Sequence, residues 1–416
     1  MEKLKEAFKT HKKEKLTAVL FIILIFVMFF GTLGNPRDFA EGFLTTYRTD
    51  VLPGTPIIDR LRGAIKAAEQ AVGEACFHRQ DFIECYGLSM DAMGKKAVID
   101  YNYGAVYKTK DDQITFTVVD RWVDGACMDL YGLVNGLKED DIPLLYIQLP
   151  FKVQPDKYGG DKELPIYVKD YANSNADDFV SKIRAAGVKA YDVREEFYNS
   201  GYSQKELFFK TDHHWTIRGA FTATGLIANY LNENYNFGIP KDLYTDKNFN
   251  QTTYEKCFIG SMGRRVGRLY GGIDDFTLFT PKFDTDLTLT QIEGLSEKVF
   301  EGSFEDAVLE KNYLEDPDPT TNRYAVYHGD YQELRFVNHK AENDSKVLII
   351  KDSFGIPVYS LLSLGIHEVR AIDMRIFEKN VVEYAKEYDP DLVIVMYNAD
   401  SFVDPMFDFN PEVKND

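Results

Sequence analysis

The segment TDHHW, residues 211–215, places a carboxylate and an imidazole two positions apart, at Asp212 and His214. If the segment is extended, side chains two positions apart share a face. The Asp212 carboxylate can then accept the Nδ1–H of the imidazole, which fixes the tautomer and leaves Nε2 free as a base. The pair therefore predicts general-base chemistry that needs a nucleophile from another part of the chain.

The best candidate nucleophile is Ser353, in the segment LIIKDSFG. It follows an apolar run that predicts a buried strand, and open α/β sheets place their sites at such strand ends. A helix that begins just after the serine also supplies backbone N–H groups suited to an oxyanion. We therefore predict that Asp212, His214 and Ser353 form a catalytic triad.

Strand-like and helix-like runs alternate around these residues. One predicted strand–helix–strand unit covers 143–150, 177–187 and 188–193, and a second block covers 346–355, 367–373, 379–390 and 391–400. Near-continuous Val, Ile and Leu runs predict strands that are buried on both faces, as in the parallel sheet of an α/β fold. Residues 240–345 lack helical periodicity and predict an insertion of short strands and long loops.

Other residues near these motifs are candidate oxyanion donors or substrate contacts. They are His213, Trp215, Arg264, Arg265, Tyr397 and Asn398. The last two follow the apolar run DLVIVM, so we expect them near the carboxyl ends of the sheet strands. The simpler interpretation is that they are ordinary turn residues. Asp373 and Arg375 are read as a structural pair beside the site.

The remaining candidates have structural readings as well. His213 is expected to point away from its neighbour, and Trp215 to pack in the core rather than stack on sugar. Arg264, Arg265 and Arg268 form the main local basic cluster of an acidic region. They would meet a carboxylated sugar or an acyl-donor partner, or form ordinary surface ion pairs.

An apolar stretch of 21 residues without a charged side chain, 16–36, lies near the N-terminus. At about 1.5 Å per helical residue it spans a bilayer core. Residues 1–15 contain six Lys and three Glu, and this Lys excess favours a cytoplasmic N-terminus with the chain outside from about residue 37. A cleaved signal peptide is the alternative interpretation. In both cases the chain from about residue 37 onward is exported.

Charge and cysteine content exclude some classes of function. The whole chain has a formal net charge of −18, and without the six Lys and three Glu of its N-terminus the exported part has −21. Such a surface repels polyanions, so we expect no nucleic-acid partner. The four cysteines are too few for a disulfide scaffold and show no CxxC spacing.

The predicted organisation follows from these patterns. It comprises a cytoplasmic tail at 1–15, a transmembrane anchor at 16–36, an N-terminal part of the exported region at 37–140, and a catalytic domain at 141–416 with an insertion at about 240–345.

The sequence resembles the bacterial group named for its DHHW motif and the related alginate O-acetylation proteins, whose domain is SGNH-hydrolase-like. The motifs that carry the resemblance are TDHHW (211–215), FIGSMGRRVG (258–267), DSF (352–354), AIDMR (371–375) and DPDLVIVMY (389–397). It covers about 140 to 416. The resemblance implies a flavodoxin-like three-layer α/β sandwich with a parallel sheet, and a triad of Asp212, His214 and Ser353. One departure is Lys351, where ordinary SGNH enzymes have the glycine of Gly-Asp-Ser.

The resemblance further implies O-acyl transfer, with acetyl as the acyl group, to a cell-surface or secreted polysaccharide. A separate multi-spanning membrane acyltransferase would deliver the acyl group to a site outside the cell membrane. The same triad suits a carbohydrate esterase, because the two outcomes differ in acceptor binding and water exclusion rather than in the nucleophile.

Two further classes stay open. Asp212, His213 and His214 superficially offer three metal ligands for a phosphoesterase, but no matching D-x-D or H-x-x-x-H motif supplies more, so we expect no metal site and no cofactor. A non-catalytic glycan-binding or assembly protein with a degenerate site is the other class.

Overall fold

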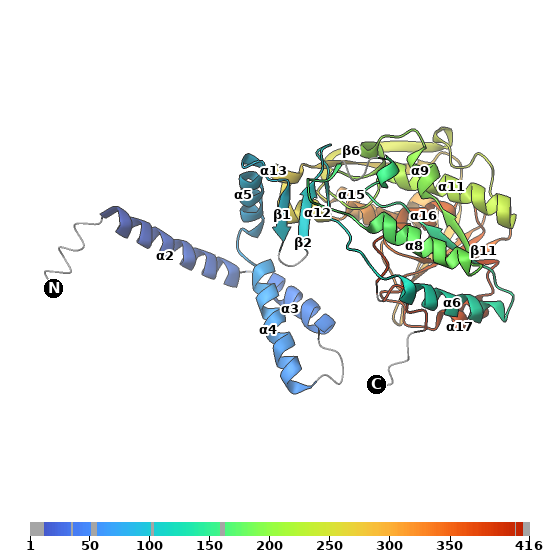
Figure 1. Ribbon diagram of the computed structural model, residues 1–416, viewed down its shortest axis with the longest axis horizontal. Helices are drawn as coiled ribbons and strands as arrows, with labels where there is room; N and C mark the ends of the chain where they lie inside the picture. The colour runs from blue at the N-terminus through green and yellow to red at the C-terminus, as the bar shows by residue number, and fades with distance from the viewer. Residues whose placement is uncertain are drawn as a thin grey trace. The chain divides into compact units, whose positions relative to one another are not determined.

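The structure is a computed structural model that describes residues 12–34, 36–50, 56–100, 104–158, 163–403 and 405–410. The described residues form two compact units, which divide between Tyr86 and Gly87. The predicted tail at 1–15 lies outside the described residues up to residue 11. The unit that begins at Gly87 contains every candidate site residue (Figure 1).

The first unit is helical. It contains α2 (Lys12–Leu33), α3 (Pro36–Asp50), α4 (Ile57–Glu74) and the start of α5 (Arg79–Ala92). Helix α2 covers most of the predicted apolar stretch at 16–36. Among the described residues, its segment Glu14–Thr32 is the one helical segment long and apolar enough to cross a membrane, and none of it is buried against protein.

The second unit is built on an eight-stranded sheet in the order β5-β4-β13-β11-β12-β10-β8-β9. Its strands are β4 (Leu144–Gln148), β5 (Lys189–Asp192), β8 (Leu287–Glu293), β9 (Ser296–Gly302), β10 (Glu333–Asn338), β11 (Lys346–Lys351), β12 (Glu368–Ile372) and β13 (Leu392–Tyr397). The run from β5 to β12 is parallel, and β10, β8 and β9 continue it antiparallel. The predicted α/β fold is confirmed, with a mostly parallel, mixed sheet.

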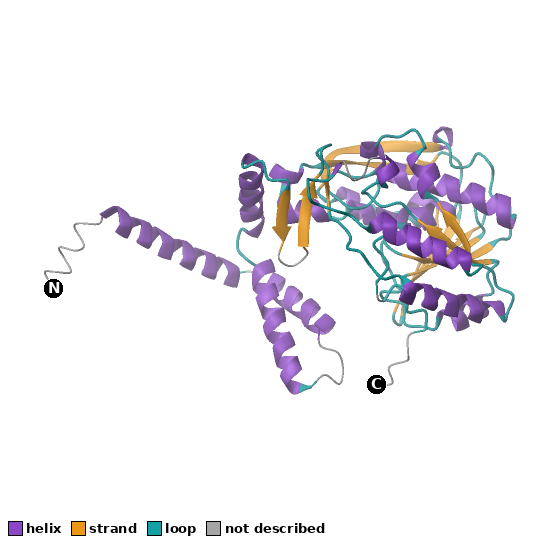
Figure 2. Ribbon diagram, viewed as in Figure 1, coloured by secondary structure: helices purple, strands orange, loops and turns teal. Residues whose placement is uncertain are grey.

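Helices cover both faces of this sheet (Figure 2). Helices α11 (Ile217–Tyr235) and α16 (Gly355–Leu362) share a core with one face, and α6 (Asp124–Lys138), α8 (Ala172–Ala185) and α17 (Val381–Tyr388) share a core with the other. Side chains of β11 alternate between the two cores: Ile349 joins the first, and Leu348 and Ile350 join the second. This burial on both faces explains the continuous apolar runs of the parallel strands.

Smaller elements surround the sheet. A three-stranded sheet holds β1 (Ala97–Asp100), β2 (Gly104–Lys108) and β3 (Ile114–Thr115), and a hairpin pairs β6 (Phe249–Phe258) with β7 (Asp274–Pro281). The short helices are α9 (Arg194–Tyr198), α10 (Gln204–Leu207), α12 (Ser261–Val266), α13 (Arg268–Gly271), α14 (Phe304–Ala307), α15 (Asn312–Glu315), η1 (Asp156–Tyr158), η2 (Asp246–Asn248) and η3 (Arg323–Tyr327).

Candidate active site

The candidate nucleophile lies in a tight turn at the carboxyl end of a central strand. Ser353 is half-buried between the end of β11 and the start of α16, as the sequence predicts. The Asp352 carboxylate accepts the N–H of Phe354 at 2.9 Å, which closes the turn. A Cβ atom at Gly355 would stand 2.8 Å from the Cβ of Lys351, so the turn leaves no room for a side chain there.

The Asp–His pair is held by a turn rather than by a strand. We expected an extended segment at 211–215, but residues 210–214 form a bend. Asp212 Oδ1 accepts the backbone N–H of His214 at 3.0 Å and its ring Nδ1 at 2.6 Å. An aspartate commonly bonds the backbone two positions on, which is why the two side chains meet without strand alternation. After the bend, Thr216 accepts the N–H of Gly219 at 3.2 Å and caps α11, as its type predicts.

Three side chains from distant parts of the chain come together at this edge of the sheet. His214 Nε2 lies 2.8 Å from Ser353 Oγ, and Nδ1 of the same ring lies 2.6 Å from Asp212 Oδ1. Because the carboxylate accepts the Nδ1–H, Nε2 is left to accept the hydroxyl proton of the serine. This is the geometry that a serine nucleophile with a histidine base requires.

The Asp212 carboxylate has a second support from the segment that begins α12. Its Oδ2 accepts the backbone N–H of Ser261 at 2.6 Å. The close approach depends on Gly260, since a Cβ there would stand 2.4 Å from Asp212 Oδ2. Burial acts to raise the pKa of Asp212, but His213 and His214 outweigh it and hold the pKa well below its usual range. This shift favours the ionised form of the carboxylate.

His213 lies beside its neighbour rather than pointing away from it. The two imidazole centroids are 3.8 Å apart, and His213 Nδ1 contacts both Ser261 Oγ at 2.9 Å and Asp212 Oδ1 at 3.2 Å. Burial acts to lower the pKa of His213, but the Asp212 carboxylate outweighs it and raises the pKa. For His214, burial and the neighbouring charge of His213 lower the pKa and outweigh the carboxylate.

These shifts predict the acid limb of the pH profile. A general base must be neutral, so lowering the pKa of His214 keeps it competent to more acidic pH. We expect kcat/KM for an acyl ester to rise with an apparent pKa below about 6.5, the ordinary value, and to stay flat through neutral pH. His213→Gln removes a positive charge beside the base and should move the midpoint upward. An unchanged midpoint in that variant would assign the limb to another group, such as Asp352, whose pKa burial raises to about 6.

Trp215 and Tyr324 hold the imidazole against the nucleophile turn. Trp215 is fully buried, as expected for a packing role, and its indole N–H is 2.7 Å from the Tyr324 hydroxyl and 3.1 Å from the carbonyl of Phe354. The Tyr324 hydroxyl donates to the same carbonyl at 3.2 Å, and its ring stacks on His214 with centroids 4.3 Å apart. These hydrogen bonds connect Trp215, which follows the bend, with Tyr324 of the insertion and with Phe354 of the nucleophile turn.

A buried lysine holds the backbone at the beginning of the bend. The Lys152 ammonium, after β4, donates to the carbonyls of Ile114, Phe209, Lys210 and Asp212 at 2.6 to 3.1 Å. Burial lowers its pKa to about 8. The four carbonyls come from two segments that are distant in the chain. This one side chain therefore helps to position Asp212.

We expect Lys152→Met to destabilise the fold by about 3 kcal/mol, because it leaves several buried carbonyls without a donor. It should also lower kcat, since the Asp212 backbone loses its support. Lys157→Met is the matched control, because Lys157 is 59% exposed. Urea unfolding of both variants measures the difference, and equal midpoints would show that Lys152 does not support this bend.

The nucleophile turn is also tied to the end of β13. Asp352 Oδ2 accepts the backbone N–H of Asn398 at 2.6 Å and the hydroxyl of Ser401 at 2.7 Å. The Asn398 side chain is 1% exposed, and its Nδ2 has no hydrogen-bond partner among the described residues. The Tyr397 hydroxyl, by contrast, donates to the Met406 carbonyl at 2.6 Å. Of these two oxyanion candidates, only Asn398 has a side-chain donor that no hydrogen bond engages among the described residues.

Backbone donors near the serine are fewer than expected. The N–H groups of Phe354 and Gly355 are engaged by Asp352, at Oδ1 and at the carbonyl respectively. Among the described residues, no hydrogen bond engages the N–H of Ser353 itself.

Lys351 has a structural explanation that the motif alone did not give. Its buried ammonium lies 2.5 Å from Asp330 Oδ1 and 2.8 Å from Asp373 Oδ2. Arg375 Nε also binds Asp373 at 2.8 Å, which confirms the predicted Asp373–Arg375 pair. The lysine side chain therefore leaves the turn and joins an ionic cluster beneath it.

The basic cluster has divided roles. Arg265 Nε contacts Asp100 at 3.2 Å and Nη2 donates to the Gly104 carbonyl at 2.6 Å, so this side chain holds the β1–β2 sheet. Arg264 and Arg268 are exposed. Arg264 lies in α12, the helix whose first residue, Ser261, binds the Asp212 carboxylate.

Metal binding has a geometric basis at this site. Asp212, His213 and His214 each offer a ligand atom, and these atoms lie within 4.8 Å of one another. Both carboxylate oxygens, however, already accept N–H donors. A metal ion would have to displace those contacts.

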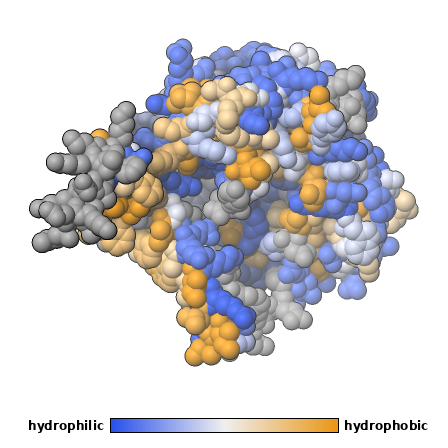
Figure 3. All heavy atoms as spheres, turned by 60° about the vertical axis from the view of Figure 1, so that its left-hand side comes forward, coloured by the Kyte–Doolittle hydropathy of each residue, from blue (hydrophilic) through white to orange (hydrophobic). Residues whose placement is uncertain are grey.

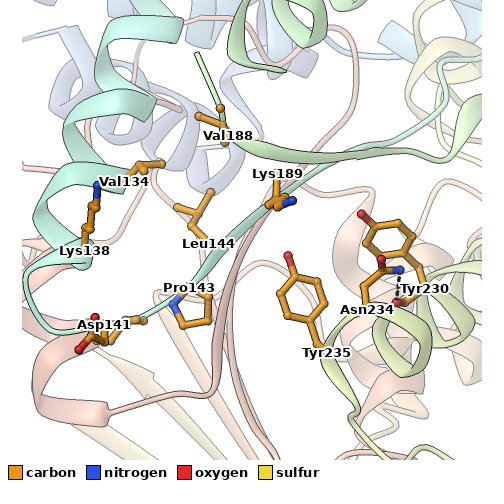
Figure 4. A pocket seen from close by; sticks show the side chains of 12 residues that line it. Val134, Lys138, Asp141, Pro143, Leu144, Val188, Lys189, Tyr230, Asn234 and Tyr235 are labelled. Atoms are coloured by element: carbon orange, nitrogen blue, oxygen red, sulfur yellow. Dashed lines mark hydrogen bonds between the residues drawn. The ribbon is translucent and has the colours of Figure 1, made fainter. Parts of the chain in front are cut away.

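Two of the cavities lie at opposite ends of strands β4 and β5. One of about 480 Å³ opens at the amino ends of β4 and β5, where Lys138, Lys189 and Tyr235 line it (Figure 4). Ser353 follows the carboxyl end of β11, at the opposite end of the parallel strands, so this cavity does not serve the candidate site. A polar cavity of about 820 Å³, lined in part by Asn173 and Arg194, opens at the carboxyl ends of the same two strands.

The fold and this site define a class: an SGNH-hydrolase-like α/β domain with a serine at a strand end beside an Asp–His pair. Residues 127–260 match the family described as "SGNH hydrolase-like domain, acetyltransferase AlgX". The matched segment includes Asp212 and His214 and stops before Ser353. The resemblance stated from the sequence is confirmed.

The solved structures that are similar to this chain include two that cover about three quarters of it. Bacillus cereus PatB1, solved with a sulfonyl adduct, has a TM-score of 0.60 and 22% identity, over 76% of this chain and 99% of that one. A DHHW family protein from Eubacterium siraeum has a TM-score of 0.57 and 16% identity, over 76% of this chain and 98% of that one. At these identities the likeness shows the fold alone. No curated protein matches the chain.

Sequence reasoning missed the residues that brace the site. Lys152, Asp274 and Tyr324 lie outside the recognised motifs; Asp274, for example, accepts the N–H groups of Lys210 and Thr211 at 2.6 and 2.7 Å. Gly260 and Ser261 lie within the FIGSMG segment that carried the resemblance. The glycine was a usable signal, because a glycine beside a polar residue commonly marks a close backbone approach.

Proposed function

We propose that this chain transfers an acyl group, acetyl, from a donor ester to a hydroxyl of a cell-surface or secreted polysaccharide. The observation that carries the proposal is the 2.8 Å contact between Ser353 Oγ and His214 Nε2, with Asp212 on the other ring nitrogen. The match to a family described as acetyltransferase supports the acetyl group. The sulfonyl adduct of Bacillus cereus PatB1 supports a reactive nucleophile in this fold.

The proposed reaction has two steps. His214 removes the hydroxyl proton of Ser353 while the serine oxygen attacks the ester carbonyl, and the donor alcohol leaves with a proton from the imidazolium. A sugar hydroxyl then gives its proton to His214 and attacks the acyl-serine, which restores the serine and yields the acylated sugar. Asp212 orients the ring and stabilises its charged form. We propose that the acceptor sugar chain binds in the polar cavity at the carboxyl ends of β4 and β5.

We propose Asn398 Nδ2 and the Ser353 N–H as the donors that stabilise the tetrahedral oxyanion. A buried amide without a partner costs about 1–3 kcal/mol, which a developing negative charge would offset. We expect Asn398→Ala to lower kcat about 10²- to 10³-fold with little change in KM. Tyr397→Phe is the control, because it removes only the bond to Met406. If the two variants keep equal kcat, Asn398 is not an oxyanion donor.

Transferase and esterase are separated by the fate of the acyl-serine. Residues 37–416 are incubated with a chromogenic acetyl ester, with and without candidate oligosaccharides, and the products are analysed by mass spectrometry. Acetylated oligosaccharide supports the proposal. Ester hydrolysis that no acceptor diverts supports a carbohydrate esterase instead.

The two other classes predict different outcomes. Loss of activity on chelation, restored by a divalent metal, would favour a metal-dependent phosphoesterase at Asp212, His213 and His214. Unchanged polysaccharide acetylation in cells that carry Ser353→Ala would favour a non-catalytic binding or assembly protein.

We further propose that α2 anchors the chain in the cell membrane with the catalytic residues outside. The segment Glu14–Thr32 is long and apolar enough to span, although a cleaved signal peptide has a similar composition. One anchor cannot carry an acyl group across a bilayer, so the donor would be supplied by a multi-spanning membrane acyltransferase. Efficient acetylation by the exported part in cells that lack such a protein would refute this partner.

A further inference from the structure

The helical hairpin of α3 and α4 has an unusual distribution of side chains. The two helices pack against each other, and α4 and its C-cap bury small residues: Ala67, Ala71 and Ala75 are at most 2% exposed. These three recur every four positions and so lie on one face of the helix. The buried face of α4 is therefore its small-residue face.

The large apolar residues of α4 lie on the adjoining face of the helix, beside the small residues rather than among them. They are Ile57, Ile58, Leu61, Ile65 and Val72, and each is between 51% and 83% exposed. At 100° per residue they occupy an arc of about 100°, the width of stripe that ordinarily faces a core. The exposed large apolar side chains of α2 have similar values, 49% to 63%. In Figure 3 the lowest part of the surface, where α4 begins, is coloured as apolar.

Both ends of the hairpin are joined to the end of α2. Helix α3 begins at Pro36, three positions after α2 ends at Leu33. Beyond α4, the N–H of Phe77 donates to Thr32 Oγ1 at 3.1 Å. If α2 spans the membrane, the hairpin therefore starts and finishes at the membrane surface.

Basic side chains flank the apolar arc. Arg60, Arg62 and Lys66 lie on the same helix, outside the arc, and Arg62 pairs with Asp59 at 2.9 Å. Long basic side chains beside a narrow apolar stripe are typical of helices that lie in the membrane interface. An arc on one face of an 18-residue helix does not provide the all-round apolar surface of a spanning helix.

We propose that α4 lies in the plane of the membrane surface, on the side where α2 emerges, with its apolar arc among lipid headgroups and upper acyl chains. Such helices sink about 5–10 Å into this region. The proposal rests on the α2 anchor proposed above, and it gives the chain a second membrane contact beyond that anchor. The partner is the lipid surface itself.

Tryptophan quenching in full-length protein, reconstituted in vesicles, tests the proposal. Leu61→Trp puts a fluorophore in the arc, and Lys66→Trp puts one well outside it. Both positions are exposed, so neither change should disturb folding, and Ile65→Trp is a second variant in the arc. After the wild-type signal is subtracted, bromine high on the acyl chains should quench the new indole of Leu61→Trp severalfold more than that of Lys66→Trp. The same bromine should also quench the Leu61→Trp variant more than bromine near the chain ends does.

Two results would overturn the proposal. Retention of the protein in vesicles after an alkaline wash, with no quenching at either arc position, would show that α2 is inserted and that protein or water covers the α4 face. Release of the protein by the wash would refute the α2 anchor, and the α4 contact would fall with it.

Discussion

Ser353→Ala is expected to lower kcat for turnover of an acetyl ester by about 10⁴-fold or more while the protein stays folded. The serine oxygen is the only atom of this site proposed to form a covalent bond, and no other hydroxyl contacts His214 Nε2 among the described residues. In enzymes with such a triad, removal of the nucleophile leaves only the contributions of substrate binding and the oxyanion donors.

The matched control is Ser360→Ala, further along α16. Its hydroxyl is fully buried and donates to the Tyr327 carbonyl at 2.7 Å, so its loss should cost about 1 kcal/mol of stability. It should leave kcat within about threefold, because it contacts no reacting group. Equal losses of kcat in both variants would point to a general effect on the fold rather than to a nucleophile.

Asp212→Asn is expected to lower kcat by about 10⁴-fold with a near-normal fold. The amide is almost the same size, but it has one acceptor where the carboxylate has two. Oδ1 receives His214 and Oδ2 receives the Ser261 N–H, so the asparagine presents an N–H to one of these donors. Either the imidazole takes the wrong tautomer or the α12 contact is lost.

Asp274→Asn is the control for this substitution. Asp274 is a second buried carboxylate that holds the same segment through the N–H groups of Lys210 and Thr211, but it does not touch the imidazole. Asp274→Asn should lower the urea midpoint of unfolding, whereas its loss of kcat should be much smaller than that of Asp212→Asn. If Asp212→Asn retains more than about a tenth of the wild-type kcat, the aspartate is not acting on the histidine as proposed.

The parallel core of the fold could be predicted because its signals are local. The apolar runs of β4, β11, β12 and β13 identify buried strands, and Thr216 identifies the start of α11. The strands at 287–302 and 333–338 were assigned only to an insertion, yet they extend the main sheet antiparallel. Alternating half-buried strands say nothing of which sheet they join, because pairing depends on tertiary contacts.

The candidate site divides in the same way. Asp212, His214 and Ser353 could be chosen from residue type and motif. The residues that hold these three in place could not be predicted. Lys152 donates to carbonyls up to 60 positions away, and Tyr324 reaches the nucleophile turn from a separate segment. Such contacts depend on how the segments fold together, and the sequence alone does not show it.

The central claim is that Ser353 is the nucleophile, and peptide mass spectrometry after treatment with a sulfonyl fluoride or a rapidly quenched acetyl ester tests it most directly. We predict one adduct, on Ser353, that forms much more slowly in His214→Ala and is absent in Ser353→Ala. An active protein that carries its adduct on a different residue, or an adduct on Ser353 whose rate does not depend on His214, would contradict the account.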